Sequence, residues 1–404
     1  MQKKLLTNGN AFKRTDGRWC GVVWFMDEAG ERKRKSFSGT TKQEVNKKMT
    51  DYIAAFHEAT VASQESKKRL RDSMQNWLEV FKFPSVERTT YDRYECTARN
   101  QIYPTLGEKI VSDITSVDVK TLLTKAMSEG YAYTTVKKIH QALNEYFRYL
   151  SEQELIARNP MTGAPMIKKS NFMASQGKQN FPTCETVTVF AEEEIERFKA
   201  ECFRCYGSGK RIYNQAAAYI LMLNTGLRAG ELLGLLNRDV DVENRVIHIR
   251  QGVKEIERRD GTAATSGREM KVGKLKSASS KRDVPLNSTA LAMIRDLRKE
   301  WYYGEDSPLV CDEKGNHTRP VNLRKRFYRI LEAAGIEQKG LHALRHTFAT
   351  NLVNGIRSED GSIRSLSPKQ VADLLGHSTS QITEMYYVKK DTKRLQGITD
   401  GFEL

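Results

Sequence analysis

Long apolar runs are missing from this sequence of 404 residues. No segment approaches the roughly 20 consecutive apolar residues that a helix needs to span a bilayer. The N-terminal segment, which begins Met-Gln-Lys-Lys-Leu-Leu-Thr-Asn, also lacks the apolar core of a signal peptide. These two absences argue against a membrane protein and against a secreted one.

Cysteine is scarce. The six cysteines are scattered along the chain, which is long enough to bury its cores without disulfide bonds. Cys202 and Cys205 form a single Cys-x-x-Cys pair, and neither a second pair nor two histidines lie near it, as a zinc site would require. The sequence also lacks a carboxylate cluster suited to a two-metal nuclease. We therefore expect a protein of the reducing cytoplasm that binds no metal and needs no cofactor.

Basic residues, by contrast, are abundant. Lys and Arg number 66 against 50 Asp and Glu, which gives a formal net charge of +16. Such an excess favours an anionic polymer as the partner, with nucleic acid first, although a ribosome-associated or membrane-surface protein would show a similar charge. The length is typical of two or three domains.

A C-terminal stretch brings together two histidines, an arginine and a tyrosine. The first histidine and the arginine are three residues apart, so they project from one face of the helix predicted over 341–354. A second helix is predicted from Ser367, an N-cap ahead of a proline, to Gly376, and the second histidine follows its end. The tyrosine comes nine residues later, on a predicted short helix. The four residues are His342, Arg345, His377 and Tyr386.

This combination suits chemistry at a phosphate. A guanidinium is a planar, permanently charged fork that matches phosphate oxygens, and an imidazole can move a proton near neutral pH. A phenol, whose ordinary pKa is about 10, becomes a useful nucleophile only beside cations and a proton acceptor. Taken one at a time, the residues also fit a core histidine, a surface arginine and an interfacial tyrosine, so the prediction depends on their combination.

An earlier segment contributes a second arginine. A helix predicted over 216–223 runs into Asn-Thr-Gly-Leu-Arg, and a new helix is predicted over 229–235. The Thr-Gly break places Arg228 at the start of the second helix, with Glu231 three residues along on the same side. The alternative is an ordinary Arg–Glu pair within one helix.

Together these segments resemble a known family. His-Ala-Leu-Arg-His from residue 342, Leu-Leu-Gly-His ending at residue 377, and a tyrosine nine residues on resemble the second signature box of the tyrosine recombinases, the lambda-integrase type of site-specific DNA recombinase. Residues 225–231, Thr-Gly-Leu-Arg-Ala-Gly-Glu, resemble the first box. Residues 276–286, Lys-Ser-Ala-Ser-Ser-Lys-Arg-Asp-Val-Pro-Leu, resemble the β-hairpin that carries the catalytic lysine of the family.

The resemblance implies a role for each residue. The tyrosine attacks a DNA phosphate and leaves a 3′-phosphotyrosine and a free 5′-hydroxyl. Two arginines stabilise the transition state, one histidine accepts the proton of the tyrosine, the other donates to a phosphate oxygen, and a lysine protonates the leaving oxygen. Lys271, Lys274 and Lys281 lie close to that lysine in the sequence, which leaves its assignment open. The attacking tyrosine is then Tyr386, and the two arginines are Arg228 and Arg345. His342 accepts the proton of the tyrosine, and His377 donates to the phosphate oxygen. Lys276 is the lysine that protonates the leaving oxygen, and Glu231 has a supporting, orienting role.

Residues 1–60 are predicted to form a small α+β domain, a three-stranded sheet followed by a helix. Strand formers are concentrated in 18–26, and Thr41 with Glu44 forms a capping box that opens the helix. The region resembles the arm-type DNA-binding domain of conjugative-transposon integrases. A sheet with clustered cations can lie in a major groove, and a solvated basic hairpin is the alternative. The clustered cations are Arg32, Lys33, Arg34 and Lys35.

Residues 69–157 are predicted to form an all-α bundle. This block looks like the core-binding domain of tyrosine recombinases, which clamps the duplex from the side opposite the catalytic domain. Its cations predicted to face phosphates are Arg93, Lys137 and Lys138. Its four predicted helices cover 70–81, 89–103, 116–127 and 134–151.

The rest of the chain is predicted to be a linker and a third domain. Residues 158–186 contain two prolines near their start and are predicted as a linker. Residues 187–404 are predicted as a catalytic domain of mixed, mainly α structure with a small β-sheet and a C-terminal tail. A long polar insertion, 254–275, offers further DNA contacts.

The chain is therefore predicted to be a multidomain site-specific recombinase that integrates and excises a mobile element, working in the bacterial cytoplasm at the nucleoid. The resemblance implies double-stranded DNA with core and arm sites, a homotetramer with exchanged C-terminal tails, and an accessory DNA-bending or excision factor. A type IB topoisomerase uses similar residues but relaxes DNA as a monomer, and the predicted arm domain and tail argue against it. A non-enzymatic DNA-binding regulator would have no reason to keep five active-site positions together.

Overall fold

The structure, a computed structural model, divides into two compact units, an N-terminal unit of residues 1–179 and a C-terminal unit of residues 180–404. Within the described ranges, none of the helices has the length and apolar composition needed to cross a membrane. The structure describes residues 4–7, 9–27, 30–176, 187–274, 281–357, 363–377 and 379–387. Within these ranges, the side chains at 57–64, 274, 356, 357, 363, 382, 385 and 386 are not described.

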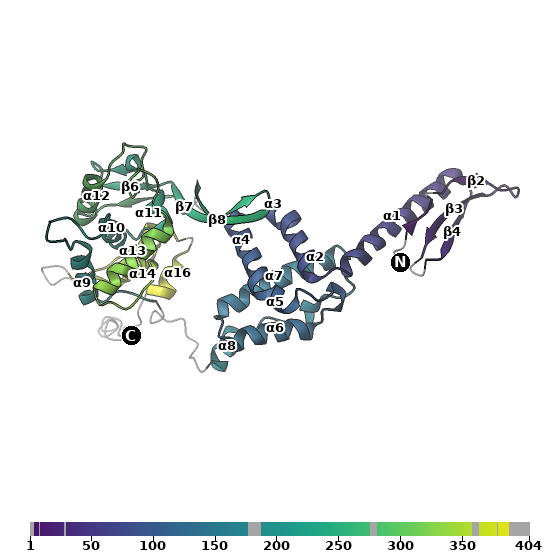
Figure 1. Ribbon diagram of the computed structural model, residues 1–404, viewed down its shortest axis with the longest axis horizontal. Helices are drawn as coiled ribbons and strands as arrows, with labels where there is room; N and C mark the ends of the chain where they lie inside the picture. The colour runs from purple at the N-terminus through teal and green to yellow at the C-terminus, as the bar shows by residue number, and fades with distance from the viewer. Residues whose placement is uncertain are drawn as a thin grey trace, which may run out of the picture. The chain divides into compact units, whose positions relative to one another are not determined.

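The N-terminal unit begins with a small antiparallel sheet (Figure 1). Its central strand β3 pairs along its whole length with β4, while β1 and β2 pair with opposite ends of its other edge. The sheet thus has four strands where the sequence predicted three, and a break separates β1 from β2. Gly9 causes the break, because its φ of +69° leaves the extended region. The strands are β1 (Lys4–Leu5), β2 (Ala11–Lys13), β3 (Trp19–Met26) and β4 (Arg32–Gly39).

Helix α1 (Lys42–Ser66) covers one face of this sheet. Val45 and Met49 of the helix pack against Val23 of β3 in a small core. The predicted N-cap is confirmed, since the Thr41 hydroxyl accepts a hydrogen bond from the amide of Glu44. The helix continues beyond residue 60, because residues 61–66 contain neither glycine nor proline to stop it.

A helical block follows, and the four helices predicted for it are all present. Two of them contain a widened π-turn, Leu78–Lys82 and Ala98–Ile102. Each π-turn ends two residues before a proline, which cannot donate to the preceding turn and clashes with it. The helices are α2 (Leu70–Trp77), η1 (Leu78–Lys82), α3 (Phe83–Ser85), α4 (Arg88–Thr97), η2 (Ala98–Ile102), α5 (Tyr103–Leu106), η3 (Val111–Asp113), α6 (Ser116–Ser128) and α7 (Tyr133–Glu152).

The first half of the predicted linker belongs to this block. Two short helices, η4 (Pro160–Gly163) and α8 (Lys169–Ser175), bring Met161, Ala164 and Phe172 into the buried core of the block. These apolar side chains hold the segment against the helical block, although its two prolines had favoured a linker. Residues 177–186 of the predicted linker lie outside the described residues.

The C-terminal unit is built around helix α10, whose residues from Ala217 to Met222 are all buried. Helices α12 and α14 pack directly against α10, and α9 packs against α13 (Figure 1). A helix buried on all sides needs apolar residues on all sides, and α10 reads Ala-Ala-Tyr-Ile-Leu-Met-Leu. The helices are α9 (Glu192–Cys202), α10 (Ala217–Thr225), α11 (Ala229–Gly234), η6 (Asn237–Asp239), α12 (Ser288–Glu300), α13 (Pro320–Ala333) and α14 (His342–Asn354).

A small antiparallel sheet in the order β5-β6-β9 accompanies these helices. Between β6 and β9 the chain forms a separate two-stranded ribbon, β7-β8, so the polar insertion predicted from the sequence is a long β-hairpin. Helix α11 lies against the base of β7, where a Cβ atom on Gly234 would come within 2.7 Å of Gly252 Cα. The strands are β5 (Val240–Asp241), β6 (Val246–Ile249), β7 (Gln251–Asp260), β8 (Ala263–Lys274) and β9 (Arg282–Pro285).

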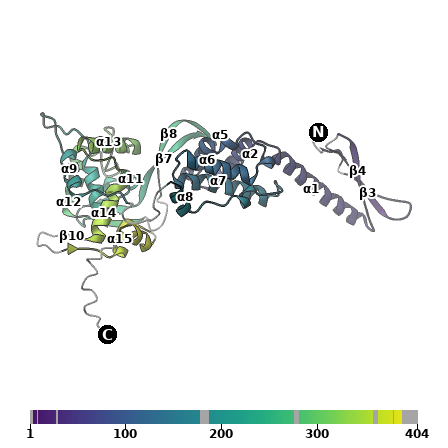
Figure 2. The same cartoon turned by 90° about the horizontal axis from the view of Figure 1, so that it is seen from below.

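The last described elements are short and cluster around α14. Helix α15 (Pro368–Leu375) lies beside α14 (Figure 2), and α16 (Ser380–Tyr387) contacts both. The predicted caps are confirmed: the Ser367 hydroxyl accepts from Gln370 N at 3.3 Å, and Gly376 ends α15 with a φ of +67°. A two-stranded pair, β10 (Ile356–Arg357) and β11 (Ile363–Arg364), connects α14 to α15.

Candidate active site

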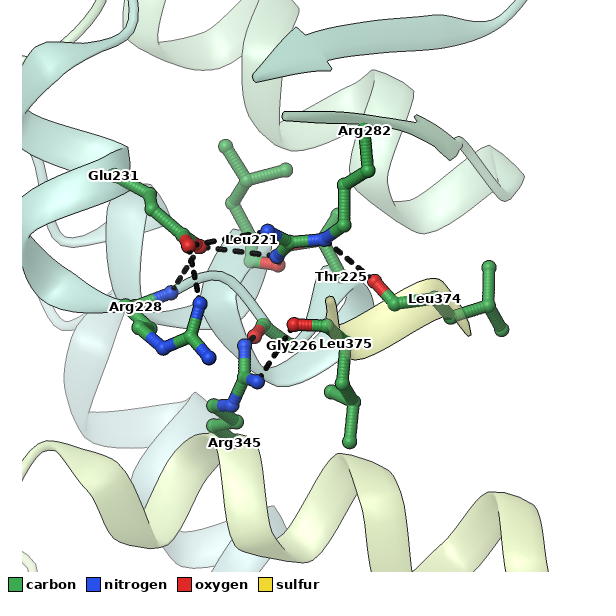
Figure 3. A network of polar contacts seen from close by, with 9 residues as sticks. All are labelled: Leu221, Thr225, Gly226, Arg228, Glu231, Arg282, Arg345, Leu374 and Leu375. Atoms are coloured by element: carbon green, nitrogen blue, oxygen red, sulfur yellow. Dashed lines mark hydrogen bonds and ion pairs between the residues drawn. The ribbon is translucent and has the colours of Figure 1, made fainter. Parts of the chain in front are cut away.

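Three arginines and one glutamate form an arginine cluster in the C-terminal unit, in which only Arg228 is partly exposed (Figure 3). Glu231 is 4% exposed and binds two of them. Arg228 donates from Nη1 to Glu231 Oε1 at 2.7 Å, and Arg282 donates from Nη1 and Nη2 to the two carboxylate oxygens at 3.1 and 3.0 Å. Glu231 therefore fixes the directions of both guanidiniums.

The third arginine of the cluster, Arg345, is held by main-chain carbonyls. Its Nη1 donates to Gly226 O and its Nη2 to Leu375 O, both at 2.7 Å. Arg282 makes a similar contact from Nε to Leu374 O at 2.7 Å. The carbonyls of Leu374 and Leu375 belong to the last turn of α15. Carbonyls in the last turn of a helix have no intrahelical partner and carry partial negative charge. The cluster thus connects the break after α10 with the end of α15.

Local sequence explains how each residue reaches the cluster. Gly226 takes a left-handed φ of +63° and ends α10, so the chain can turn and start α11 with Arg228 as its N-cap. The amide of Arg228 donates to Glu231 Oε2 at 2.9 Å, which is the glutamate half of a capping box. A Cβ atom on Gly226 would lie 2.6 Å from the Phe348 ring, so the close contact of this turn with α14 also requires glycine.

Charge within the cluster sets the protonation of its members. Burial alone would raise the pKa of the Glu231 carboxyl, but the hydrogen bonds and charges of Arg282 and Arg228 outweigh it and hold the pKa below its ordinary value. Burial and the positive charge of Arg228 lower the pKa of Arg345 to about 9. Both groups are therefore charged at neutral pH.

The histidines of the stretch lie next to the arginine cluster and are neutral at pH 7. Burial, followed by the charges of Arg345 and Arg228, lowers the pKa of His342 below its ordinary value and that of His377 to about 4. His377 Nδ1 lies 2.9 Å from the Thr383 hydroxyl. Because that nitrogen is engaged, Nε2 is the nitrogen that His377 can present to a substrate.

Tyr387 approaches the same group from α16. Its hydroxyl lies 2.7 Å from Nδ1 of His346, and its ring is parallel to that of His377, with 6.4 Å between the ring centroids. Burial, with the nearby His342 and Arg345, lowers the pKa of His346 to about 4. Tyr387 directly follows the predicted nucleophile, Tyr386.

The structure brings together most of the residues that the sequence singled out. Two predicted residues are not placed: the side chain of Tyr386, on α16, and the whole of Lys276 lie outside what is described. Within the described residues, no three His, Cys, Asp or Glu side chains converge where they could hold a metal ion. The predicted residues that lie in or beside the arginine cluster are Arg228, Glu231, His342, Arg345 and His377.

Sequence reasoning missed Arg282 as a member of the site. A signal was present, because Arg282 and Val284 are two residues apart on β9 and therefore share a face. Val284 is 1% exposed, and the arginine that shares its face is 9% exposed. A cation on the buried side of a strand requires a buried partner, and the partner is Glu231.

The cations predicted to contact DNA in the N-terminal unit are all exposed, but those of the sheet divide between its two faces. Arg34 pairs with Trp24 on the face away from α1, and the Cζ atoms of Arg32 and Arg34 lie 4.7 and 5.8 Å from the Trp24 ring centroid. Lys33 and Lys35 pair with residues of the α1-covered face, and Lys33 is engaged by Asp27. On the helical block, Arg93, Lys137 and Lys138 are solvent-exposed.

Comparison with known proteins identifies the family of this chain. Residues 188–394 match the phage integrase family, and residues 69–127 match the N-terminal SAM-like domain of phage integrases. The chain belongs to the phage integrase family. It is a tyrosine recombinase of the integrase type, an enzyme that cuts and rejoins DNA. A type IB topoisomerase and a non-enzymatic regulator are not favoured.

Relatives and solved structures agree with this family. A XerC-like tyrosine recombinase of Caldanaerobacter subterraneus subsp. tengcongensis is 28% identical over 396 residues, which cover 93% of this chain and 94% of the relative. The integrase of Mycobacterium phage D29 is 25% identical, covering 74% of this chain and 69% of the relative.

Two structural neighbours share the fold. The Tn1549 transposon integrase in complex with transposon right-end DNA has a TM-score of 0.60 at 20% identity, covering 81% of this chain and 98% of the neighbour. The lambda integrase tetramer bound to a Holliday junction has a TM-score of 0.56 at 18% identity, covering 95% of this chain and 98% of the neighbour. The chain therefore has the integrase fold, with a SAM-like helical domain ahead of the catalytic domain.

Proposed function

We propose that this enzyme is the integrase of a mobile element, which cuts and rejoins double-stranded DNA at specific core sites at the bacterial nucleoid. The observation that carries the proposal is the charge of the arginine cluster. Three guanidiniums, Arg228, Arg282 and Arg345, face one carboxylate, Glu231. A partly buried excess of positive charge is costly unless an anion balances it. A DNA phosphate is the anion that the family and the basic sequence support.

Arg228 and Arg345 are the proposed clamp of the scissile phosphate. Each terminal guanidinium nitrogen carries two N–H donors, and the contacts of Arg345 Nη1 and Nη2 with main-chain carbonyls use one donor each. The remaining donors can bind the oxygens of the pentacoordinate transition state, where preorganised charge stabilises most. Glu231 and the carbonyls hold the guanidiniums in place before the substrate arrives.

The proposed proton movements follow from the neutral histidines. Tyr386 attacks the phosphorus in line, its proton passes to His342, and the product is a 3′-phosphotyrosine and a free 5′-oxygen, which Lys276 protonates. A neutral imidazole can accept a proton, and neutral His377 can donate an N–H from Nε2 to a non-bridging oxygen. Rejoining reverses these steps with a 5′-hydroxyl of the other duplex as the attacking group.

The assembly that we propose contains four protomers on two duplexes, with C-terminal tails exchanged between neighbours and an accessory DNA-bending or excision factor. The lambda integrase tetramer on a Holliday junction supports this assembly by analogy. The tail, residues 388–404, lies outside the described residues. We further propose that the helical block, 69–157 with the segment up to residue 176 that packs in its core, binds core DNA opposite the catalytic domain of 187–404. Its contacts are Arg93, Lys137 and Lys138, and residues 177–186 connect the two parts.

The N-terminal sheet, within residues 1–60, is the proposed arm-site module. The division of its cations supports one contact surface, the open face on which Arg32 and Arg34 flank Trp24. A guanidinium stacked on an indole is held in a fixed direction, which suits the major groove edges of guanine. Lys33 and Lys35 then serve as weaker, peripheral contacts.

The test is covalent trapping on a nicked suicide duplex that carries the core site. We expect an SDS-stable protein–DNA adduct that forms in the presence of EDTA, that maps to Tyr386, and that disappears in Tyr386→Phe while duplex binding persists. Tyr387→Phe is the matched control, because it removes the same hydroxyl one residue away and should still form the adduct. An adduct mapped to Tyr387, or cleavage that returns only with magnesium, would contradict the mechanism.

A further inference from the structure

The helix that carries the proposed nucleophile is too short to hold itself in place. Helix α16 has eight residues, Ser380–Tyr387, and helices of this length are marginal in water without tertiary contacts. A nucleophile displaced by about 1 Å loses on the order of 10²-fold in rate. The contacts that fix α16 therefore bear directly on catalysis, and the roles proposed above do not account for them.

The described contacts of α16 come from one face. Thr383 and Tyr387 are four residues apart, so they lie above one another on the helix, and they are 0% and 3% exposed. Thr383 engages His377 Nδ1 at 2.9 Å, and the Tyr387 hydroxyl engages His346 Nδ1 at 2.7 Å. The main-chain carbonyl of Tyr387 also accepts from Asn354 Nδ2 at 3.0 Å.

Tyr387 makes the contacts that reach α14. His346 directly follows the clamp arginine Arg345 on α14, and Asn354 is the last residue of that helix. Two contacts from one residue, one through the side chain and one through the main chain, fix both the position and the rotation of the end of α16. Consecutive helical residues point about 100° apart, so the rotation fixed by Tyr387 also determines where Tyr386 projects.

We infer that Tyr387 is a positioning residue for the recombination reaction: its hydroxyl on His346 and its carbonyl on Asn354 hold α16 so that Tyr386 faces the phosphate. This inference rests on the proposed function, with Tyr386 as the nucleophile. Tyr387 itself does not touch the substrate, because its hydroxyl is committed to His346 and its ring is buried between His346 and His377.

The test compares variants of the full-length chain in single-turnover cleavage of the suicide duplex at saturating protein. Tyr387→Phe keeps the ring and removes the hydroxyl, and we expect cleavage to slow by about 3- to 10-fold, the effect of one neutral hydrogen bond. The dissociation constant for the core duplex should not change. His346→Leu should slow cleavage similarly, and adding Tyr387→Phe to it should cost less than about twofold more, because both changes remove one contact.

A matched control separates positioning from general stability. Tyr219 is also fully buried in the C-terminal unit, and its hydroxyl donates to Leu323 O at 2.8 Å, away from α16. Tyr219→Phe should lower thermal stability about as much as Tyr387→Phe but keep the wild-type cleavage rate. His346→Asn, whose amide stands close to the position of Nδ1, should recover part of the rate lost in His346→Leu.

The outcomes distinguish this inference from the proposed function. Wild-type cleavage speed in Tyr387→Phe, or an equal loss in Tyr219→Phe, would overturn the inference and leave Tyr386 as the nucleophile. An adduct on Tyr387 would overturn both. If the wild-type chain formed no adduct, the proposed function would fail. Amide hydrogen exchange over 380–387 would then test only whether the contacts of Tyr387 hold α16 in place. Faster exchange in Tyr387→Phe than in Tyr219→Phe supports this inference, and equal exchange contradicts it.

Discussion

Glu231→Gln tests the arginine cluster most directly. The change keeps the shape of the side chain and removes the charge that faces Arg282 and Arg228. In the Glu231–Arg282 pair the side chains are 3% and 6% exposed, so water cannot replace the lost partner. Removing one member of a buried pair typically costs about 3–5 kcal/mol. We expect a loss of about 3 kcal/mol, at the lower end, because the glutamine carbonyl can still accept one hydrogen bond.

The pH dependence of this loss carries its own signature. The pKa of Glu231 is lower in the folded chain than its ordinary value, so the unfolded state binds the proton more tightly. The stability from the carboxylate is therefore fully present above the unfolded pKa of about 4.3 and is lost as the pH falls through the folded pKa. Wild type and Glu231→Gln should differ most near neutral pH and converge in acid.

The assay is amide hydrogen exchange during urea unfolding, because peptides from the C-terminal unit then report that unit alone. Glu196→Gln is the control: Glu196 forms an ion pair with Lys199 on the surface, with side chains 68% and 40% exposed, and should change stability by less than about 0.5 kcal/mol. Suicide-duplex cleavage by Glu231→Gln should also slow, by up to about 10²-fold, since Arg228 loses its orientation. An unchanged unfolding midpoint at pH 7, or a difference that persists in acid, would refute the reasoning.

Three further predictions follow from the same geometry. The pKa values of His346 and His377 are both lowered to about 4, so the unfolded chain binds more protons than the folded chain below about pH 6.5. Stability should therefore fall as the pH drops from about 6.5 to 4. An NMR titration that finds either imidazole charged at pH 6 would contradict this. Arg228→Lys should slow cleavage by about 10²–10³-fold with little loss of core-duplex binding, and near-normal cleavage would remove Arg228 from the site. Arg34→Ala should weaken arm-duplex binding and reduce its salt dependence more than Lys35→Ala does, whereas equal effects in a binding titration would argue against the open face as the contact surface.

The helix caps and the turn before α11 show what local sequence determines. A capping residue, a glycine with positive φ or a proline acts within one turn of the chain, so the caps at Thr41, Ser367 and Gly376 and the break at Gly226 were predictable from neighbours alone. The same holds for the family, because its signature residues stand in short fixed spacings. Charge and apolar periodicity likewise predicted a basic, multidomain, mainly helical chain.

Packing over long separations decided the rest. Arg282 reaches Glu231 across 51 residues of sequence, and Tyr387 reaches His346 across 41. No local preference connects such pairs, because their meeting depends on which face of a strand or helix the core covers. Helix α1 continued past residue 60, where the predicted N-terminal domain ended, and the proline-containing segment after the helical block packed through Phe172. At both positions the local sequence set only a preference for one backbone conformation. The free energy gained from burying apolar side chains, or from continuing a helix without interruption, determined the structure.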